Sequence, residues 1–154
     1  MAALRPPDEI MLTAEPNAEG EPQILVFSTN NISDPGIDLA GGSHMPYSSS
    51  VVVIPVPCSS GIKPSWVLHA IDAGFDGVFI AADGTDCAYV PDCTKRTGEV
   101  VKKAQSLLEE RKHDPRRLKM AAICSVCAES FQSHMEKFKA ALLKLGSLEE
   151  KVAQ

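Results

Sequence analysis

From Gln23 onward, short apolar runs typical of β-strands alternate with longer segments that have helical periodicity. Continuous apolar runs indicate strands that are covered on both faces. Parallel strands joined by right-handed helical crossovers satisfy this pattern, because the helices then lie on both faces of one sheet. We therefore predict an α/β protein with a four-stranded parallel sheet in a flavodoxin-like three-layer sandwich. The predicted strands are residues 24–27, 51–56, 77–82 and 118–123.

Local signals add detail to this architecture. The stretch 34–36, Asp-Pro-Gly, favours a turn, so the first strand is expected to end in a loop. Pro55 cannot donate a ladder hydrogen bond, which predicts that its strand lies at a sheet edge or ends there. Ser65 is expected to cap a short helix and Gly74 to end it. The apolar positions at helical spacing are Trp66, Val67, Ala70 and Ile71, then Val100, Val101, Ala104, Leu107 and Leu108, then Phe131, Met135, Phe138, Leu142 and Leu145.

The chain has 154 residues, which corresponds to about one domain. Residues 1–22 contain several prolines among acidic residues and few apolar ones, so we expect a flexible N-terminal tail followed by a single α/β domain over residues 23–154. No apolar run approaches the ~20 residues that span a bilayer, and no secretory signal is visible, which predicts a cytoplasmic protein without membrane insertion. The net charge of −5 argues against nucleic acid as a partner.

The five cysteines carry most of the chemical information in the chain. Without an export signal a disulfide framework is not expected, and the odd number leaves one cysteine unpaired. The predicted topology places all five at the edge formed by the carboxyl ends of the strands, where ligands bind in open α/β sheets. Thiolates suit an iron–sulfur cluster or zinc, and a C-x-x-C pair can bind one metal or act as a dithiol. The candidate metal ligands are Cys58, Cys87, Cys93, Cys124 and Cys127.

Other residue types point to no separate active site. His69 and His134 fall within predicted helices, and His113 lies at a helix end, so we expect structural roles for them. His44 lies in the loop before the second strand, and it is the one histidine for which a role as a ligand or a base stays open. Neither a dinucleotide-binding nor a P-loop glycine motif occurs, and no nucleophile–base spacing indicates an enzyme.

Six stretches of the chain resemble the delta subunit of methyl-viologen-reducing hydrogenase. The resemblance implies an electron-transfer subunit that carries a [2Fe-2S] cluster and has no active site of its own. It also implies a partner, an HdrA-like flavin and iron–sulfur subunit, in a larger redox complex that includes a hydrogenase or formate dehydrogenase. The stretches, spread over residues 23–145, are 34–41, 57–61, 66–70, 76–80, 85–89 and 116–118.

The chain departs from this family at the end of the first strand. Family members carry a cysteine cluster there, whereas this chain has Ser-Thr-Asn-Asn at residues 28–31. Cys58 and Cys87 correspond to family cysteines, but Cys124 and Cys127 match no family motif, and neither does Cys93.

Two interpretations follow from this departure. Either the ligands have moved along the same sheet edge, or the cluster has been lost. We favour the first, with Cys58, Cys87, Cys124 and Cys127 as ligands and Cys93 as a spare or substitute. The alternatives are a cluster-free structural adaptor and a structural zinc–thiolate domain.

Overall fold

A single parallel sheet forms the centre of the molecule, as seen in a computed structural model that describes residues 21–30, 32–43, 51–83, 92–126 and 128–146. The strand order is β2-β1-β3-β4, and all neighbouring strands are parallel. In the register, Ile24 pairs with Val51 on one side and with Gly77 on the other. The predicted four-stranded parallel sheet is confirmed, with strands β1 (Ile24–Thr29), β2 (Val51–Val56), β3 (Gly77–Ala82) and β4 (Leu118–Ala122).

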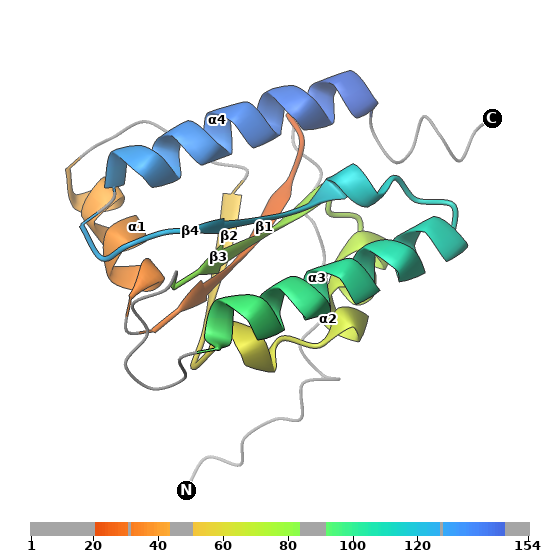
Figure 1. Ribbon diagram of the computed structural model, residues 1–154. Helices are drawn as coiled ribbons and strands as arrows, with labels where there is room; N and C mark the ends of the chain where they lie inside the picture. Colours follow the sequence, from red (N-terminus) through yellow and green to blue (C-terminus); the bar gives the residue numbers. More distant parts are fainter. Residues whose placement is uncertain (1–20, 31, 44–50, 84–91, 127, 147–154) are drawn as a thin grey trace, which may run out of the picture.

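Helices cover both faces of this sheet and complete a three-layer sandwich (Figure 1). Helices α1 (Ser33–Gly42) and α4 (Ala128–Leu145) pack together on one face, and α2 (Pro64–Asp72) and α3 (Cys93–Glu110) pack together on the other. Two short 3-10 helices, η2 (Ser59–Gly61) and η4 (Pro115–Arg117), follow β2 and precede β4. This arrangement follows from right-handed crossovers between parallel strands.

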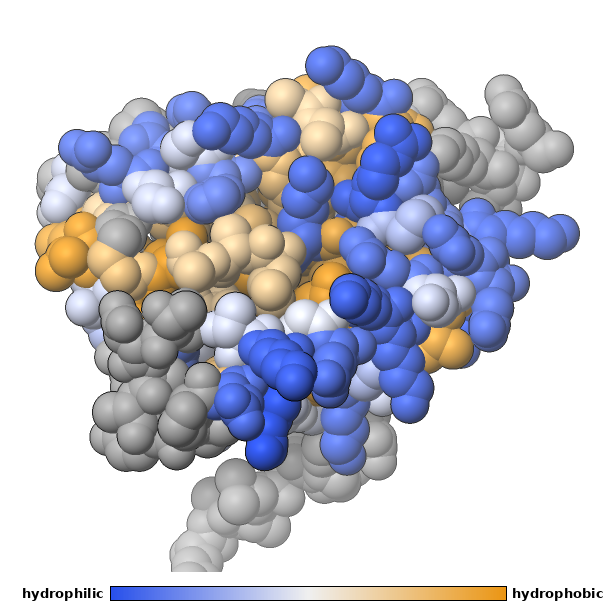
Figure 2. Space-filling view, viewed as in Figure 1, coloured by the Kyte–Doolittle hydropathy of each residue, from blue (hydrophilic) through white to orange (hydrophobic). Residues whose placement is uncertain are grey.

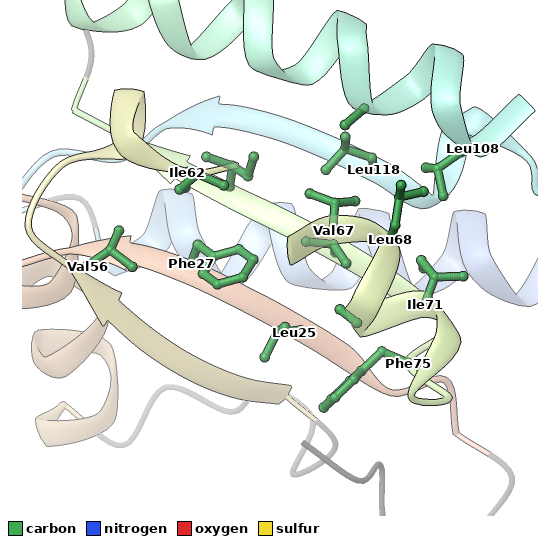
Figure 3. Close-up of a cluster of buried hydrophobic side chains, with 14 residues drawn as sticks. Leu25, Phe27, Val56, Ile62, Val67, Leu68, Ile71, Phe75, Leu108 and Leu118 are labelled. Atoms are coloured by element: carbon green, nitrogen blue, oxygen red, sulfur yellow. The ribbon is translucent and has the colours of Figure 1, made fainter. Parts of the chain in front are cut away.

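The hydrophobic core consists of two clusters, one on each face of the sheet. Successive side chains of a strand point to opposite faces, so β1 and β3 contribute to both clusters and are buried along their whole length. Leu25 and Phe27 of β1 lie on the face covered by α2 and α3, in one cluster with Val67 of α2 and Leu108 of α3 (Figure 3). The opposite cluster joins Ile24, Val26, Phe79 and Ala81 to Ile37, Ala40, Phe131, Met135, Phe138 and Leu142.

Two local predictions need correction. The turn expected at residues 34–36 is the first turn of α1, because proline is tolerated in a first helical turn and Gly36 allows close contact with the chain after β4. Helix α2 begins at Pro64 rather than after a Ser65 cap, since Pro64 has the fixed φ that suits the first helical position. Trp66 on this helix is 37% exposed, and Leu68 is buried instead.

Other local predictions are confirmed. Strand β2, which contains Pro55, lies at the edge of the sheet. Gly74 follows α2 with a φ of 105°, a conformation that favours glycine just beyond a helix end.

Most of the predicted tail, residues 1–22, lies outside the described residues, but Glu21 forms an ion pair with Lys139 of α4.

The face of the molecule seen in Figure 2 is mostly hydrophilic, with one apolar band visible between α4 and α3. This band follows β4, the second edge strand, where Met120 and Ala121 are partly buried and Ala122 is exposed. Among the described residues, no helix is both long enough and apolar enough to cross a membrane.

Candidate thiol site

Two cysteines that are distant in sequence meet at the carboxyl end of the sheet. Cys58 follows β2 and precedes η2, while Cys93 is the first residue of α3. Packing of η2 against α3 brings their Sγ atoms to 3.6 Å from each other. The sequence predicts Cys93 as a spare or substitute ligand, whereas the structure places it beside Cys58.

Hydroxyl groups surround this pair, which we call the Cys58/Cys93 pair. Ser59 Oγ lies 3.3 Å from Cys93 Sγ and 2.9 Å from Thr97 Oγ1, and Thr97 Oγ1 in turn donates to the carbonyl oxygen of Cys93 at 2.8 Å. Ser60 Oγ lies 3.0 Å from Cys58 Sγ. Ser59 and Thr97 are fully buried. Thr97 follows Cys93 by one helical turn, a spacing that could have marked it as a second member of the site.

The two thiols differ in exposure and in environment. Cys93 is 1% exposed, whereas Cys58 is only partly buried. Burial raises the pKa of Cys93, but hydrogen bonds with the Ser59 hydroxyl, Cys58, the Ser60 backbone and Thr97 together outweigh it, so its pKa is lower than that of an ordinary thiol. The amide groups in the first turn of α3 also favour a thiolate at this position.

The other predicted ligands do not join the Cys58/Cys93 pair within the described residues. Cys124 follows β4, and strands β1 and β3 lie between β4 and β2, so Cys124 and Cys58 lie at opposite edges of the sheet. Cys124 is disulfide-bonded. Its carbonyl oxygen contacts α1 at Gly36, on the face of the sheet opposite α3. Cys87 and Cys127 lie outside the described residues, as does His44.

Hydroxyl and carboxylate groups occupy the end of β1, where the strand order reverses. The backbone N–H of Thr29 donates to Ser33 Oγ at 2.6 Å, and Ser33 Oγ donates to the carbonyl oxygen of Ala81 at 2.9 Å. Thr29 Oγ1 also donates to Asp83. Thr29 and Ser33 are buried and satisfy each other's hydrogen bonds. The end of β1, where the family resemblance led us to look for cysteines, therefore holds a polar network in this chain.

The donor set can be compared with the needs of an iron–sulfur cluster. A [2Fe-2S] cluster takes four cysteine thiolates, or two thiolates and two histidines in one variant. Among the described residues, no group of three or more histidine, cysteine, aspartate or glutamate side chains is placed to hold a metal. The described residues thus fit a site of two thiols, and they do not by themselves fit a four-thiolate cluster or a tetrathiolate zinc site.

The predicted structural role of His134 agrees with its surroundings. Its ring lies 5.8 Å from that of Phe79, measured between centroids, on the α4 side of the sheet. Burial lowers the pKa of His134, and the nearby charges of Lys137 and Lys119 lower it further. The neutral imidazole is favoured, as expected for a side chain that covers the core.

Comparison with known proteins identifies the family of the chain. Residues 24–146 match the family of the methyl-viologen-reducing hydrogenase delta subunit, and the chain belongs to this family. It is 29% identical over 133 residues to the iron-sulfur subunit of the F420-non-reducing hydrogenase of Archaeoglobus profundus, covering 83% of this chain and 93% of that protein. It is 32% identical over 127 residues to the iron-sulfur subunit of the F420-non-reducing hydrogenase vhu of Methanococcus maripaludis, covering 82% and 94%.

A third relative is a much longer protein. The chain is 32% identical over 131 residues to the HdrA-type subunit of the ferredoxin:CoB-CoM heterodisulfide reductase of Methanosarcina mazei. The match covers 82% of this chain but only 16% of that protein. A unit of this kind therefore exists both as a separate chain and as a segment of a larger redox protein.

Proposed function

We propose that this protein is a subunit of a hydrogenase- or heterodisulfide-reductase-type redox complex in the cytoplasm, and that it docks on an HdrA-like flavin and iron–sulfur subunit. The observation that carries this proposal is the similarity of most of this chain to 16% of a heterodisulfide reductase polypeptide. When one unit is covalently joined to a second in one protein and separate in another, contact between the two units is the simplest reason for both arrangements, since fusion raises their effective concentration.

Electron transfer through a [2Fe-2S] cluster is the role that the family resemblance implies within such a complex. The cluster would take Cys58, Cys87, Cys124 and Cys127, with Cys93 as a substitute. In the described residues Cys58 and Cys124 lie at opposite edges of the sheet. A four-thiolate site would therefore require the segments that carry Cys87 and Cys127 to bring their thiols to the edge of Cys58 and Cys93, because the edge of Cys124 would hold only three thiols. A site that includes Cys124 would also require its disulfide to be reduced.

A cluster-free adaptor is the second candidate function, and two observations favour it. Only the Cys58/Cys93 pair comes together among the described residues, and the end of β1 is filled by the network around Thr29 and Ser33. In this case the α/β domain contributes a docking surface to the complex and no metal cluster.

Metal analysis separates the two candidates. Full-length protein prepared without oxygen is assayed for iron, acid-labile sulfide and zinc, alongside the double variant Cys124→Ser/Cys127→Ser. The cluster hypothesis expects iron and sulfide in equal amounts and their loss in the variant. Stoichiometric zinc without colour indicates the structural zinc domain, and absence of all three elements supports the adaptor.

The docking proposal has a separate test that does not depend on a metal. The tagged protein is expressed together with the HdrA-like subunit of the same organism, and the purified material is examined by size-exclusion chromatography with light scattering. A stable complex of defined stoichiometry is expected. Two chains that elute separately at micromolar concentration would contradict the docking proposal whatever the metal content is.

A further inference from the structure

We propose that the Cys58/Cys93 pair is a redox-active dithiol that exchanges with organic disulfides. This activity goes beyond the role in the complex, because it requires neither a cluster nor a partner protein. The two Sγ atoms are 3.6 Å apart and no disulfide joins them. A disulfide has an S–S distance of about 2.05 Å, so closing the bond requires an approach of only about 1.5 Å.

The position of the pair in the fold allows this approach without moving the core. Cys58 lies between the end of β2 and η2, outside the regular part of the sheet. Cys93 is fixed at the start of α3, where Thr97 Oγ1 donates to its carbonyl oxygen at 2.8 Å. The side chain of Cys58 can therefore turn toward a sulfur whose position is set by the helix.

The different exposures assign different tasks to the two sulfurs. Cys58 is partly exposed and can meet a disulfide from solution, whereas Cys93 is 1% exposed and, among the described residues, has Cys58 as its neighbouring thiol. The Ser59 hydroxyl, at 3.3 Å from Cys93 Sγ, can donate a hydrogen bond to the sulfur when Cys93 is the leaving group. Exchange between a thiolate and a disulfide proceeds through a mixed disulfide. An accessible thiol forms this mixed disulfide, and a second thiol next to the first resolves it.

The reaction balances with a disulfide R–S–S–R as the oxidant. The Cys58 thiolate attacks one sulfur of R–S–S–R, so that a Cys58–S–S–R bond forms and one R–S⁻ leaves. The Cys93 thiolate then attacks Cys58 Sγ, which forms the Cys58–Cys93 disulfide and releases the second R–S⁻. The protein loses two electrons and two protons, and R–S–S–R becomes two thiols. Reduction runs through the same steps in reverse, with the incoming thiol attacking Cys58.

Ser106 supplies the control, since it is exposed and lies thirteen residues after Cys93 on α3. Reduced full-length protein, prepared without oxygen and with its iron content recorded, is equilibrated in glutathione buffers of increasing oxidised fraction. Samples are quenched in acid, alkylated and mapped by peptide mass spectrometry. A Cys58–Cys93 cross-link is expected to appear and to disappear again on reduction, in the wild type and equally in Ser106→Ala.

Two variants test the order of the steps. Cys93→Ser should accumulate glutathione on Cys58, because the second step is blocked. Cys58→Ser should protect Cys93 from glutathione, with a rate of modification at least about tenfold lower than that of Cys58 in Cys93→Ser, because Cys93 is buried. Circular dichroism spectra like that of the wild type show that each variant is folded.

The outcome on the wild type decides the proposal even if a variant fails to fold. Absence of the Cys58–Cys93 cross-link at every glutathione ratio in the folded protein would overturn it. Iron-containing protein in which glutathione never reaches Cys58 would also overturn it, and would support the cluster. Failure to bind the HdrA-like partner contradicts only the docking proposal, so the two failures are distinguishable.

Discussion

Ser59 has the strongest influence of any single neighbour on the state of the Cys93 thiol, after burial itself. Its hydroxyl hydrogen bond lowers the pKa of Cys93 against the opposing effect of burial. We predict that Ser59→Ala raises the pKa of Cys93, because burial then acts with less compensation. Thiolate absorbance in the ultraviolet, followed against pH, measures the change. Ser60→Ala is the control, since its hydroxyl contacts Cys58 and its backbone remains.

The same pKa links Cys93 to the stability of the fold. A thiol whose pKa is lower in the folded than in the unfolded protein contributes stability that is fully present above the unfolded pKa and is lost as pH falls through the folded pKa. The free energy of unfolding, from urea titrations, should therefore rise with pH across this window more steeply in the wild type than in Ser59→Ala. Equal slopes would show that the Ser59 hydrogen bond does not act on the thiolate.

Gly36 and Gly41 belong to the same helix and have opposite surroundings. A Cβ atom at Gly36 would collide with the carbonyl oxygen of Cys124, whereas nothing lies within 4 Å of one at Gly41. Gly36→Ala should lower the free energy of unfolding by about 1–3 kcal/mol, because backbone must shift to make room. Gly41→Ala should instead raise it by up to about 1 kcal/mol, since alanine restricts the unfolded chain and suits a helix. Chemical denaturation of both variants tests this contrast.

Arg117 connects three elements through its buried guanidinium group. It donates to the carbonyl oxygen of Asp76, just before β3, at 2.9 Å and to that of Gly146, just after α4, at 2.8 Å. Arg117→Met leaves both carbonyl oxygens without this donor and should destabilise the protein by about 1.5–3 kcal/mol, measured by urea denaturation. Arg116→Met is the matched control, because Arg116 is exposed and pairs with Asp114 at the surface. Similar losses in both variants would contradict the role assigned to Arg117.

The elements themselves could be predicted from the sequence where apolar periodicity was strong. The strands and the buried faces of α3 and α4 follow directly from such patterns. Helix α1 could not be predicted, because its sequence contains Asp34-Pro-Gly36, which favours a turn locally. Packing against α4, burial of Ile37 and Ala40 in the core and contact with the segment after β4 stabilise helix there, and these contacts join residues distant in sequence.

The sequence predicts at which edge of the sheet the candidate site lies, but it does not predict which side chains are in contact there. Parallel topology alone indicates that Cys58, Cys93 and Cys124 all follow carboxyl ends of strands. The pairing of Cys58 with Cys93 depends on the strand order β2-β1-β3-β4 and on how η2 meets α3, which no local pattern encodes. Proximity in sequence favoured the C-x-x-C pair instead, since two thiols separated by two residues are easy to recognise.

Among the described residues, the most exposed large apolar side chain lies near the carboxyl edge of the sheet. Val126 is 79% exposed and follows Cys124 closely, while Leu143 is 57% exposed near the other end of α4. With about 1.5 Å per residue, α4 separates these two positions by more than about 20 Å. If the carboxyl edge of the sheet faces the HdrA-like partner, Val126 becomes part of the interface and Leu143 does not.

Substitution of these two residues tests that orientation. Val126→Asp should weaken binding to the HdrA-like partner by about 1 kcal/mol or more, roughly fivefold in Kd, because burying an aspartate in an apolar contact costs hydration energy. Leu143→Asp should leave Kd unchanged, and urea denaturation of both variants controls for loss of fold. Isothermal titration calorimetry provides the measurement. Weaker binding by Leu143→Asp alone would place the partner at the opposite edge, so that the Cys58/Cys93 pair would remain open to solution disulfides inside the complex.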